Sequence, residues 1–416
     1  MTRVLHFADA HIDMTTTGKH DPKTGLPIRV MDYLKSLDTI VQTAINEKVD
    51  LVIFAGDTYR DRSPQPTFQR EWGKRIMKLS RAAIPAILIT GNHDISPAYQ
   101  RAHSMQEFET LEPPYIHMVS RPTLLHPQDL DGLPLQVIAL PWVTRAAMLG
   151  MVQHRDEQPA NALGELEDLL SQFVEAALAE TDPSQPVVLA AHASIAGAKF
   201  GNEQTIKIGK DVLLPPGFVC NPCFDYVALG HIHKYQNLNE GLHPPVIYPG
   251  SIERVDFGEI NEDKSFVIAD VQKGRTHVER RVLNTRPFLE RTVRLEAEDD
   301  VMAKLRDAIP DEAELEDAIF RLIIHYPKVL EPMIDELALR ELANSALDFK
   351  IDKKPTTRAR ARLDLKGETA SMAPIQLLDI YWQESNLDPA LRPKLRQLAE
   401  QIISDVNSGD ADSTIG

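Results

Sequence analysis

The sequence predicts an α/β fold for residues 1–284 of this 416-residue chain. Two observations support this prediction. Short apolar runs, typical of buried strands, recur along this part of the chain, and each ends in a polar cluster. Helical patterns lie between the early runs, at Asp32 to Lys48 and at Thr67 to Arg81. Strands that alternate with helices indicate an α/β core, in which ligands gather beyond the carboxyl ends of the strands.

Five apolar runs carry the polar clusters. In chain order they are RVLHF before ADAH, DLVIFA before GDTYR, PAILIT before GNHD, PVVLAA before HAS, and FDYVALG before HIHK. One histidine after a strand is more often a hydrogen-bonded structural residue than a ligand. Five clusters that all follow strands favour a shared site at one edge of the core.

The pattern changes after about residue 285. Residues 285–352 are expected to form strand, helix, strand, helix and strand, which suits a small α+β module. Residues 353–373 are an expected linker, and the stretch from Lys350 to Lys366 holds seven Lys or Arg against two acids. Two helices are expected at 374–385 and 389–406, followed by a flexible tail at 407–416.

The composition is that of an ordinary soluble protein, with 43% hydrophobic and 25% charged residues. The net charge of −16 argues against a chain that holds nucleic acid mainly through a global positive field. Metal ions or a local basic patch can supply positive charge where phosphates bind. No apolar run approaches the ~20 residues that cross a bilayer, and the first residues lack a signal-peptide layout. We therefore expect a cytoplasmic protein with no membrane contact.

The two cysteines, Cys220 and Cys223 in CNPC, are too few for a disulfide framework. A lone CxxC also lacks the second pair of ligands that a structural zinc ion needs. Ordinary buried thiols are the expectation, and a redox or zinc role is the alternative.

The side chains of the five clusters offer mostly carboxylate and amide oxygen and imidazole nitrogen. This mixture suits Mn²⁺, Fe²⁺ or Zn²⁺ with open coordination positions. Seven ligands are too many for one catalytic ion, but they suit two ions that share one carboxylate, as in phosphoryl hydrolysis. Asp57 is the natural bridge because it lies between the two ligand groups in sequence and follows Gly56. The candidate ligands are Asp9, His11, Asp57, Asn92, His192, His231 and His233.

The ordered blocks DAH, GD, GNHD, a lone His and GHIH resemble the signature of calcineurin-like metallophosphoesterases. A closer resemblance is to the SbcD family, the nuclease subunits of bacterial SbcCD repair complexes and counterparts of the MRN-complex nuclease. VIYPGSIERVDFGEINEDKSFVIADV, from Val246 to Val271, resembles the segment after the metal ligands, and NTRPFLERTV resembles the start of the capping domain. The resemblance implies a sandwich of two sheets flanked by helices, a small α+β capping domain and a C-terminal helix pair.

The resemblance also implies roles for the candidate residues. Asp9, His11 and His233 would hold one Mn²⁺, and Asn92, His192 and His231 the other, with Asp57 as the bridge. Mg²⁺, Fe²⁺ and Zn²⁺ are alternatives to Mn²⁺. His93 would be the acid that does not bind metal, set near the scissile phosphate, and Asp94 would orient its imidazole.

Arg60 departs from the family pattern. Archaeal and eukaryotic relatives carry a second catalytic histidine three residues after the bridging Asp, where this chain has Arg60. An arginine cannot shuttle protons at neutral pH, so Arg60 is instead a candidate contact to phosphate or to a base. Arg358, Arg360 and Arg362 in the basic segment are candidate DNA-backbone contacts, with a solvated linker as the alternative.

The resemblance implies two protein interfaces. The C-terminal helix pair, with Tyr381 and Trp382 as anchors, would bind the coiled coil of an SbcC-like ATPase, and packing on the body is the alternative. Helices at 67–80 and 98–109 would form a homodimer within a heterotetramer. The apolar stripe Phe68, Trp72, Ile76 and Leu79 could equally be core.

The expected function is an Mn²⁺-dependent 3′ to 5′ exonuclease on double-stranded DNA that also cuts single strands internally. It would act in DNA repair and recombination, at the nucleoid. One alternative is a phosphoesterase for a small nucleotide or a phosphoprotein, which would not need the modules after residue 285. Another is a non-catalytic scaffold that positions an ATPase on DNA.

Overall fold

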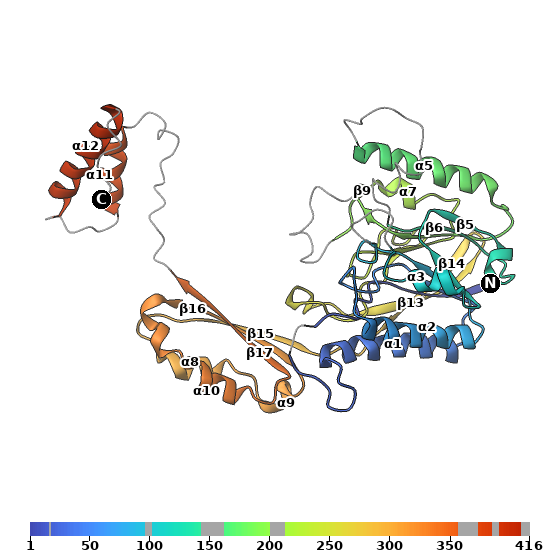
Figure 1. The fold of residues 1–416 in the computed structure, drawn as a ribbon, viewed down its shortest axis with the longest axis horizontal. Coiled ribbons are helices and arrows are strands. Elements are labelled where there is room, and N and C mark those ends of the chain that lie inside the picture. Colours follow the sequence, from blue (N-terminus) through green and yellow to red (C-terminus); the bar gives the residue numbers. More distant parts are fainter. Residues whose placement is uncertain are drawn as a thin grey trace. The chain divides into compact units, whose positions relative to one another are not determined.

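The computed structural model describes residues 1–15, 18–95, 102–142, 162–199, 213–356, 373–384 and 391–408 (Figure 1). The chain divides into two compact units. The first is Met1–Leu289 with Glu316–Ile319, and the second is Glu290–Leu315 with Phe320–Gly416. Within the described ranges, no helix is both long and apolar enough to cross a membrane.

The first unit contains a six-stranded sheet in the order β14-β13-β1-β2-β3-β4. Strands β1 to β4 run parallel, and β13 pairs antiparallel with both β1 and β14. The bounds are β1 (Thr2–Phe7), β2 (Leu51–Phe54), β3 (Ala86–Ile89), β4 (Ile116–Val119), β13 (Ser265–Gln272) and β14 (Arg275–Val282).

A second six-stranded sheet of the same unit has the order β11-β12-β10-β7-β6-β5. Its central strands β12, β10, β7 and β6 are parallel, and both edge strands are antiparallel to their neighbours. The bounds are β5 (Thr123–Leu125), β6 (Gln136–Leu140), β7 (Val187–His192), β10 (Tyr226–Gly230), β11 (Gln236–Asn237) and β12 (Val246–Tyr248). A short pair, β8 (Ser194–Ile195) and β9 (Leu213–Leu214), lies beyond β7.

Side chains that alternate along the strands bury both faces of each sheet. On β1, Val4 belongs to the apolar cluster that includes Val188 and Ala228 of the second sheet, whereas Leu5 packs into a different cluster with the helices. Burial on both faces explains why the strands read as continuous apolar runs. Helices α1 (Ile28–Asn46), α2 (Pro66–Arg81) and α3 (Gln106–Leu111) cover the first sheet, and α5 (Ala162–Glu180) covers the second (Figure 1).

The apolar stripe of α2 faces the core of the first unit. Trp72, Ile76 and Leu79 are fully buried, and Phe68 is 8% exposed. This stripe is therefore core packing rather than a surface for a second copy of the chain. Residues 98–101 of the other helix expected in a dimer lie outside the described residues, and the helix there begins at Gln106.

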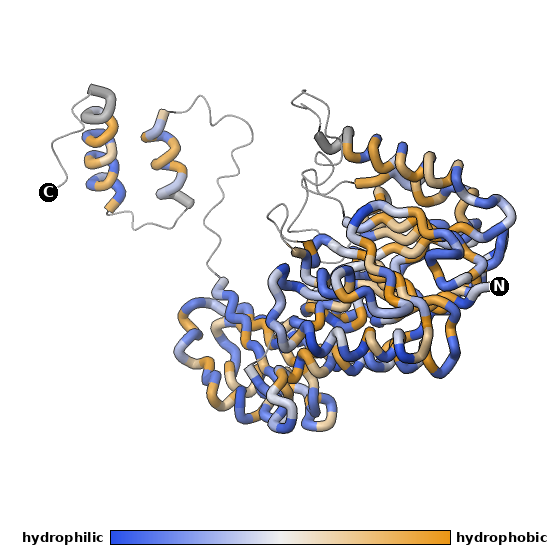
Figure 2. The backbone as a smooth tube through the Cα atoms, turned by 45° about the vertical axis from the view of Figure 1, so that its right-hand side comes forward, coloured by the Kyte–Doolittle hydropathy of each residue, from blue (hydrophilic) through white to orange (hydrophobic). Residues whose placement is uncertain are grey.

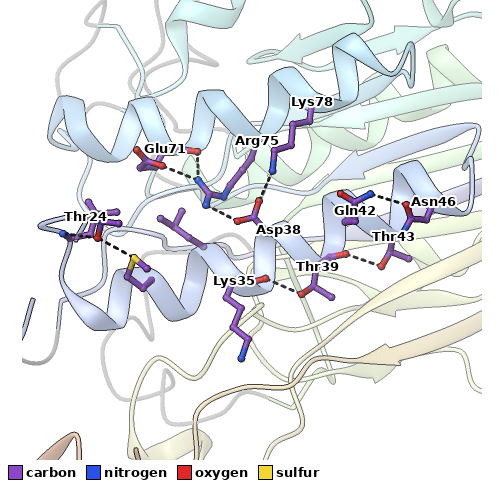
Figure 3. Close-up of a pocket in the computed structure, with 13 residues that line it drawn as sticks. Thr24, Lys35, Asp38, Thr39, Gln42, Thr43, Asn46, Glu71, Arg75 and Lys78 are labelled. Atoms are coloured by element: carbon purple, nitrogen blue, oxygen red, sulfur yellow. Dashed lines mark hydrogen bonds and ion pairs between the residues drawn. The ribbon is translucent and has the colours of Figure 1, made fainter. Parts of the chain in front are cut away.

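Charged side chains hold α1 and α2 together at the surface. Asp38 of α1 accepts hydrogen bonds from Arg75 at 2.7 Å and from Lys78 at 2.8 Å, both on α2. Arg75 also pairs with Glu71 one turn earlier. These residues and Leu34 of α1 line a pocket of about 800 Å³. Figure 3 shows Arg75 and Lys78 of α2 reaching Asp38 of α1.

The second unit is an α+β module in which a three-stranded sheet has the order β15-β16-β17. Phe320 and Phe349 stack in its core with their ring centroids 5.0 Å apart. The elements follow the order that the sequence predicts. They are β15 (Phe288–Arg294), α8 (Val301–Asp307), α9 (Glu312–Leu315), β16 (Ile319–Pro327), the 3₁₀ turn η3 (Lys328–Met333), α10 (Glu336–Leu342) and β17 (Asp348–Thr356).

Strand β17 extends beyond the boundary expected at residue 352. It includes Lys353 and Lys354, which were expected in the linker. Lys353 donates to a 2.9 Å ion pair with Glu336, so part of its charge is already neutralised. The candidate DNA contacts Arg358, Arg360 and Arg362 lie outside the described residues.

The C-terminal helix pair consists of α11 (Pro374–Glu384) and α12 (Arg392–Ser408). An ion pair of 2.9 Å joins Arg396 to Asp379 between the two helices. Leu391, just before α12, and Leu398 and Ile402 on α12 are each about half exposed. Figure 2 shows that hydrophobic and hydrophilic residues alternate along both helices. Of the expected tail, Asn407 and Ser408 belong to α12 and the rest lies outside the described residues.

The described part of the first unit also contains three short helical turns, namely η1 (Pro127–Leu130), α7 (Pro216–Val219) and η2 (Phe257–Glu259). Both cysteines follow α7 as free thiols, Cys220 half-buried and Cys223 exposed. The expectation of two buried thiols is therefore wrong for Cys223, because it lies in a surface turn rather than on the apolar face of an element.

Candidate metal centre

The predicted ligands meet at one edge of the sandwich, beyond the carboxyl ends of five strands. Four come from the first sheet and three from the second, and all are at least half-buried. The two sheets meet here through the main-chain N–H of His231, which donates to both carboxylate oxygens of Asp9 at 3.1 Å. In strand order the side chains are Asp9 and His11 after β1, Asp57 after β2, Asn92 after β3, His192 at the end of β7, and His231 and His233 after β10.

The loops that carry these side chains adopt an uncommon backbone conformation. Four of the residues have positive φ although none is glycine: Asp9 at 52°, His11 at 39°, Asp57 at 62° and His231 at 101°. Such conformations cost about 1–3 kcal/mol each and persist where the surroundings hold them. Main-chain hydrogen bonds from Asp9 to Gly56 (2.9 Å) and from Ala10 to Asp57 (2.8 Å) hold the first two loops together.

Two glycines make the close approach of these loops possible. A Cβ atom at Gly91 would lie 2.2 Å from Oδ1 of Asp57, and one at Gly56 would lie 2.3 Å from Nδ1 of His192. Gly56 also has a φ of 95°, which side chains rarely tolerate. The glycines of the GD and GNHD blocks therefore leave the space that the ligand side chains occupy.

The ligand atoms form two clusters. One contains Asp9, His11 and His233, and the other contains Asp57, His192 and His231; within each, the ligand atoms lie within 4.8 Å of one another. Each cluster draws on both sheets. Oδ1 of Asn92 joins the second cluster, 3.1 Å from Nε2 of His192 and 2.9 Å from Nδ1 of His231.

Asp57 lies between the two clusters. Its Oδ2 atom is 3.4 Å from Nε2 of His192 and 3.9 Å from Nε2 of His11. Burial disfavours its charged form, yet the imidazole of His192, with smaller contributions from His93 and His11, holds the pKa of Asp57 well below its usual range. The side chain is therefore an ionised carboxylate between two groups of ligands, as a bridging ligand must be.

The outer nitrogens of three imidazoles show that the residues fit metal ions. Nδ1 faces a carbonyl oxygen in His11 (Tyr59, 3.3 Å) and in His192 (Ala55, 2.6 Å), and it faces the Glu259 carboxylate in His233 (2.8 Å). The ring proton is best placed on Nδ1, so Nε2 presents its lone pair to the cluster. Nε2 of His11 and Nε2 of His233 lie 3.1 Å apart, as two ligands of one ion would. This donor set suits a pair of divalent ions.

Burial controls the charge of the histidines. It lowers the pKa of His11 to about 3, so this imidazole is neutral at physiological pH, as a metal ligand must be. Burial also opposes a charge on His192, but the ionised Asp57 outweighs it and raises the pKa of His192 to about 9. A divalent ion would take the place of that proton.

Glu259 and Lys264 support the first cluster and are absent from the sequence prediction. Glu259 accepts hydrogen bonds from Nδ1 of His233 and from Nζ of Lys264, each at 2.8 Å. Burial opposes its charge, but His233 and Lys264 outweigh burial and lower the pKa of Glu259 to about 2. The signal was in the sequence, because Glu259 stands in the segment VIYPGSIERVDFGEINEDKSFVIADV and a carboxylate is one of the common acceptors for the outer N–H of a metal-binding histidine.

Trp142, just after β6, lies beside the second cluster and was also missed. Its ring centroid is 5.0 Å from that of His231 and 6.0 Å from that of His192. Its main-chain N–H donates to the carbonyl of Thr90, which ties it to the loop of Asn92. A tryptophan after an apolar run carries no sequence signal for such a position.

His93 lies beside the first cluster without belonging to it. Its ring is perpendicular to that of His11, with 5.3 Å between centroids. Its main-chain N–H donates to Oδ1 of Asp57 at 2.8 Å, and its Nδ1 lies 2.8 Å from the carbonyl oxygen of Arg60. The guanidinium of Arg60 is directed elsewhere and contacts the sulfur of Met14.

Asp94 does not orient His93 as expected. Its buried carboxylate accepts main-chain hydrogen bonds from Asp57 (2.9 Å), Thr58 (3.0 Å) and Gly91 (2.9 Å), and one from the hydroxyl of Ser104 (3.1 Å). Burial and the nearby Asp57 raise its pKa. Asp94 fixes the loops after β2 and β3 relative to each other, because its carboxylate accepts hydrogen bonds from main-chain amides of both loops.

The comparisons agree with this geometry. Residues 2–235 match the family described as calcineurin-like phosphoesterase. This chain belongs to the calcineurin-like phosphoesterase family. Membership confirms the expected α/β sandwich and an enzyme of the phosphoesterase class, and the two ligand clusters agree with the use of divalent metal ions.

Relatives of this calcineurin-like phosphoesterase include proteins named as the SbcD component of the nuclease SbcCD, as the resemblance implied. The one from Rhodobacter capsulatus is 27% identical over 86% of this chain and 87% of its own length. The one from Escherichia coli K12 is 25% identical over 66% of both chains. Among solved structures, a dimetal phosphatase from Danio rerio matches 68% of this chain and 96% of its own, with 10% identity and a TM-score of 0.39.

Proposed function

We propose that this phosphoesterase is a metal-dependent DNA nuclease, the catalytic component of an SbcCD-type complex. The observation that carries the proposal is the pair of ligand clusters on either side of Asp57, with His93 beside them. A relative named as the SbcD component of SbcCD matches most of the chain, including a part beyond the phosphoesterase domain. That extent favours a nuclease over a compact enzyme for a small nucleotide or a phosphoprotein.

The proposed reaction is the hydrolysis of a phosphodiester bond. Asp9, His11 and His233 would hold one ion, and Asn92, His192 and His231 the other, with Asp57 shared. Two divalent ions bound in this way activate water and polarise the phosphoryl group. Mn²⁺ is the proposed metal, because oxygen and imidazole ligands with open positions suit it.

His93 is the proposed acid. Its Nδ1–H donates to the carbonyl of Arg60, so Nε2 is the nitrogen that exchanges a proton. An imidazolium beside the scissile phosphate would stabilise the developing charge and protonate the departing 3′ oxygen. This role assigns to His93 an effect of about 10²- to 10⁴-fold on kcat.

The finer features of the proposal follow the family resemblance. They are 3′ to 5′ exonuclease activity on duplex DNA, internal cleavage of single strands, and control by an SbcC-like ATPase. The exposed apolar residues Leu398 and Ile402 support α12 as a surface for the coiled coil of that ATPase. A homodimer within a heterotetramer, acting at the nucleoid in the cytoplasm, completes the proposal; its dimer contact must lie outside the buried stripe of α2.

The test compares the wild-type chain with His93→Ala on linear duplex DNA in Mn²⁺, with and without a coiled-coil ATPase partner. We expect release of nucleotides by the wild type and a loss of at least about 100-fold in the variant at equal metal content. Equal rates would reject the role of His93. A wild type that cleaves bis(4-nitrophenyl) phosphate but no DNA would favour the small-substrate alternative, and a wild type that binds DNA but cleaves neither would favour the scaffold.

A further inference from the structure

The carboxylate of Asp13 anchors the loop that carries Arg60. Oδ1 accepts the main-chain N–H of Arg60 at 2.5 Å, and Oδ2 accepts that of Asp61 at 2.9 Å. One carboxylate thus binds two successive amides, 47 and 48 residues later in the sequence. Asp13 itself follows the first two predicted ligands, Asp9 and His11, in the loop after β1.

The loops after β1 and β2 are joined by a row of hydrogen bonds. Main-chain bonds run from Ala10 to Asp57 (2.8 Å) and from Ile12 to Thr58 (3.1 Å), and the two bonds to Asp13 continue this row. Asp13 provides a side-chain acceptor at the point where the main-chain pairing ends. The position of Arg60 therefore depends on Asp13 rather than on a regular strand or helix.

Arg60 in turn holds His93 by its main chain. The carbonyl oxygen of Arg60 lies 2.8 Å from Nδ1 of His93 and fixes both the ring orientation and the site of the ring proton. The guanidinium lies on the sulfur of Met14 and takes no part in this contact. This arrangement explains how an arginine can stand beside the proposed catalytic histidine without shuttling protons itself.

We propose that Asp13 is a positioning residue for His93 and acts through the main chain of Arg60. The inference rests on the proposed function, since it assigns a second contributor to the same acid. Removal of the Asp13 carboxylate leaves two amides without their acceptor, so the loop shifts and the Arg60 carbonyl no longer holds the imidazole. We expect the loss of the Asp13 carboxylate to lower kcat rather than to raise KM. The reason is that the candidate metal ligands and the proposed DNA-binding surface keep their side chains.

The first experiment uses the full chain loaded with Mn²⁺ and a linear duplex DNA oligonucleotide as substrate, because the departing 3′ oxygen needs the proton that His93 would supply. We expect Asp13→Ala to lower kcat by about 10- to 100-fold with little change in KM or metal content. Asp13→Asn retains one of the two acceptor oxygens and should recover part of the loss. Asp182→Ala is the matched control, because Asp182 also binds a loop amide, that of Ser184 (2.9 Å), at the opposite end of β7 from His192.

The second experiment repeats Asp13→Ala in a His93→Ala background. If Asp13 acts through His93, the double variant has the kcat of His93→Ala alone. Equal losses in both backgrounds would overturn the proposal, because Asp13 would then act on the metal ligands or on the fold. A loss of bound Mn²⁺ in Asp13→Ala would overturn it for the same reason.

A third measurement separates this inference from the proposed function. In protein labelled with ¹⁵N-histidine, the His93 ring signals are identified by their absence in His93→Ala. Asp13→Ala should shift the Nδ1 signal of His93, since its hydrogen bond to Arg60 is lost, whereas Asp182→Ala should not. An unshifted signal would reject the role of Asp13, whatever the enzyme hydrolyses. If the wild type has no phosphodiesterase activity but Asp13→Ala still shifts the Nδ1 signal of His93, the proposed function is rejected and the role of Asp13 stands.

Discussion

Nδ1 of His233 and Oε1 of Glu259 lie 2.8 Å apart, on two segments 26 residues apart in sequence. The carboxylate is almost fully buried and also holds the buried ammonium of Lys264. This contact gives the His233 imidazole a negative partner on the side away from the metal ligands. Its effect is to fix the ring and to increase the basicity of Nε2.

We predict that Glu259→Gln weakens metal binding at the first cluster by about 10- to 100-fold. Glutamine still accepts the hydrogen bond from His233 but carries no charge. Calorimetric titration of the metal-free protein with Mn²⁺ measures the change. Glu262→Gln is the matched control, because Glu262 also contacts the ammonium of Lys264, at 3.1 Å, whereas the hydrogen bond from Nδ1 of His233 goes to Glu259. Equal affinities of the two variants would contradict the prediction.

Gly91→Ala should weaken the binding of both ions, because Asp57 is the ligand that they would share. The added methyl group would lie 2.2 Å from Oδ1 and 2.5 Å from the main-chain nitrogen of Asp57, so this residue must move. Gly73→Ala is the control, because Gly73 lies within α2 with no atom within 4 Å of the added Cβ, and alanine there should stabilise the helix by up to about 1 kcal/mol. Metal analysis after dialysis gives the number of ions bound. Two ions retained by Gly91→Ala would refute the role of this close approach.

Trp142 should report metal binding by fluorescence. Its indole packs 5.0 Å from the ring of His231, whereas Trp72 lies on the buried face of α2 in the core. Paramagnetic Mn²⁺ quenches the emission of an indole at such short range. We expect addition of Mn²⁺ to quench the emission of the wild type and to have much less effect on Trp142→Phe. Quenching of equal size in both proteins would mean that the signal comes from another tryptophan.

His6 should make stability depend on pH. Its ring is fully buried, with Nδ1 2.9 Å from the hydroxyl of Tyr226 and Nε2 3.1 Å from the carbonyl of Leu229. Burial lowers its pKa from 6.5 to about 3 in the folded protein. Between these two values the unfolded chain binds the additional proton, so the free energy of unfolding falls as the pH falls below 6.5, by up to about 1.4 kcal/mol per pH unit.

Urea unfolding of the wild type and of His6→Gln at pH 7, 6 and 5 tests whether the free energy of unfolding falls with pH as predicted. The variant lacks the titrating group, so its free energy of unfolding should fall less steeply than that of the wild type. The other buried histidines are common to both proteins and cancel in the difference. The same slope in both would contradict the burial of a neutral His6.

The sequence could predict which side chains lie together because strand ends are local features. Each apolar run and the polar residues after it lie within about ten positions, and parallel strands bring their carboxyl ends to one edge. Asp9, Asp57 and Asn92 could be identified without any knowledge of which strand pairs with which. The sequence could not show which strands belong to which of the two sheets, because buried strands of either sheet have the same continuous apolar pattern.

The sequence-based predictions fail where a contact depends on the direction of a side chain or on segments far apart in the sequence. Asp94 follows His93 in sequence, which suggested a contact between their side chains, but the carboxylate turns inward to the main chain of Asp57 and Gly91. Nδ1 of His93 instead faces a carbonyl oxygen of Arg60, and a main-chain acceptor leaves no mark on the sequence. Glu259 is likewise brought to His233 only by the folded chain.

The division of each ligand cluster between two sheets has a consequence for the newly made chain. Asp9, His11 and Asp57 leave the ribosome well before His192, His231 and His233, and neither group alone offers a complete set of ligands. A partly synthesised chain would therefore lack part of each candidate site. We expect hydrolytic activity only after the second sheet has formed against the first, so the order of synthesis itself delays this activity until the domain is complete.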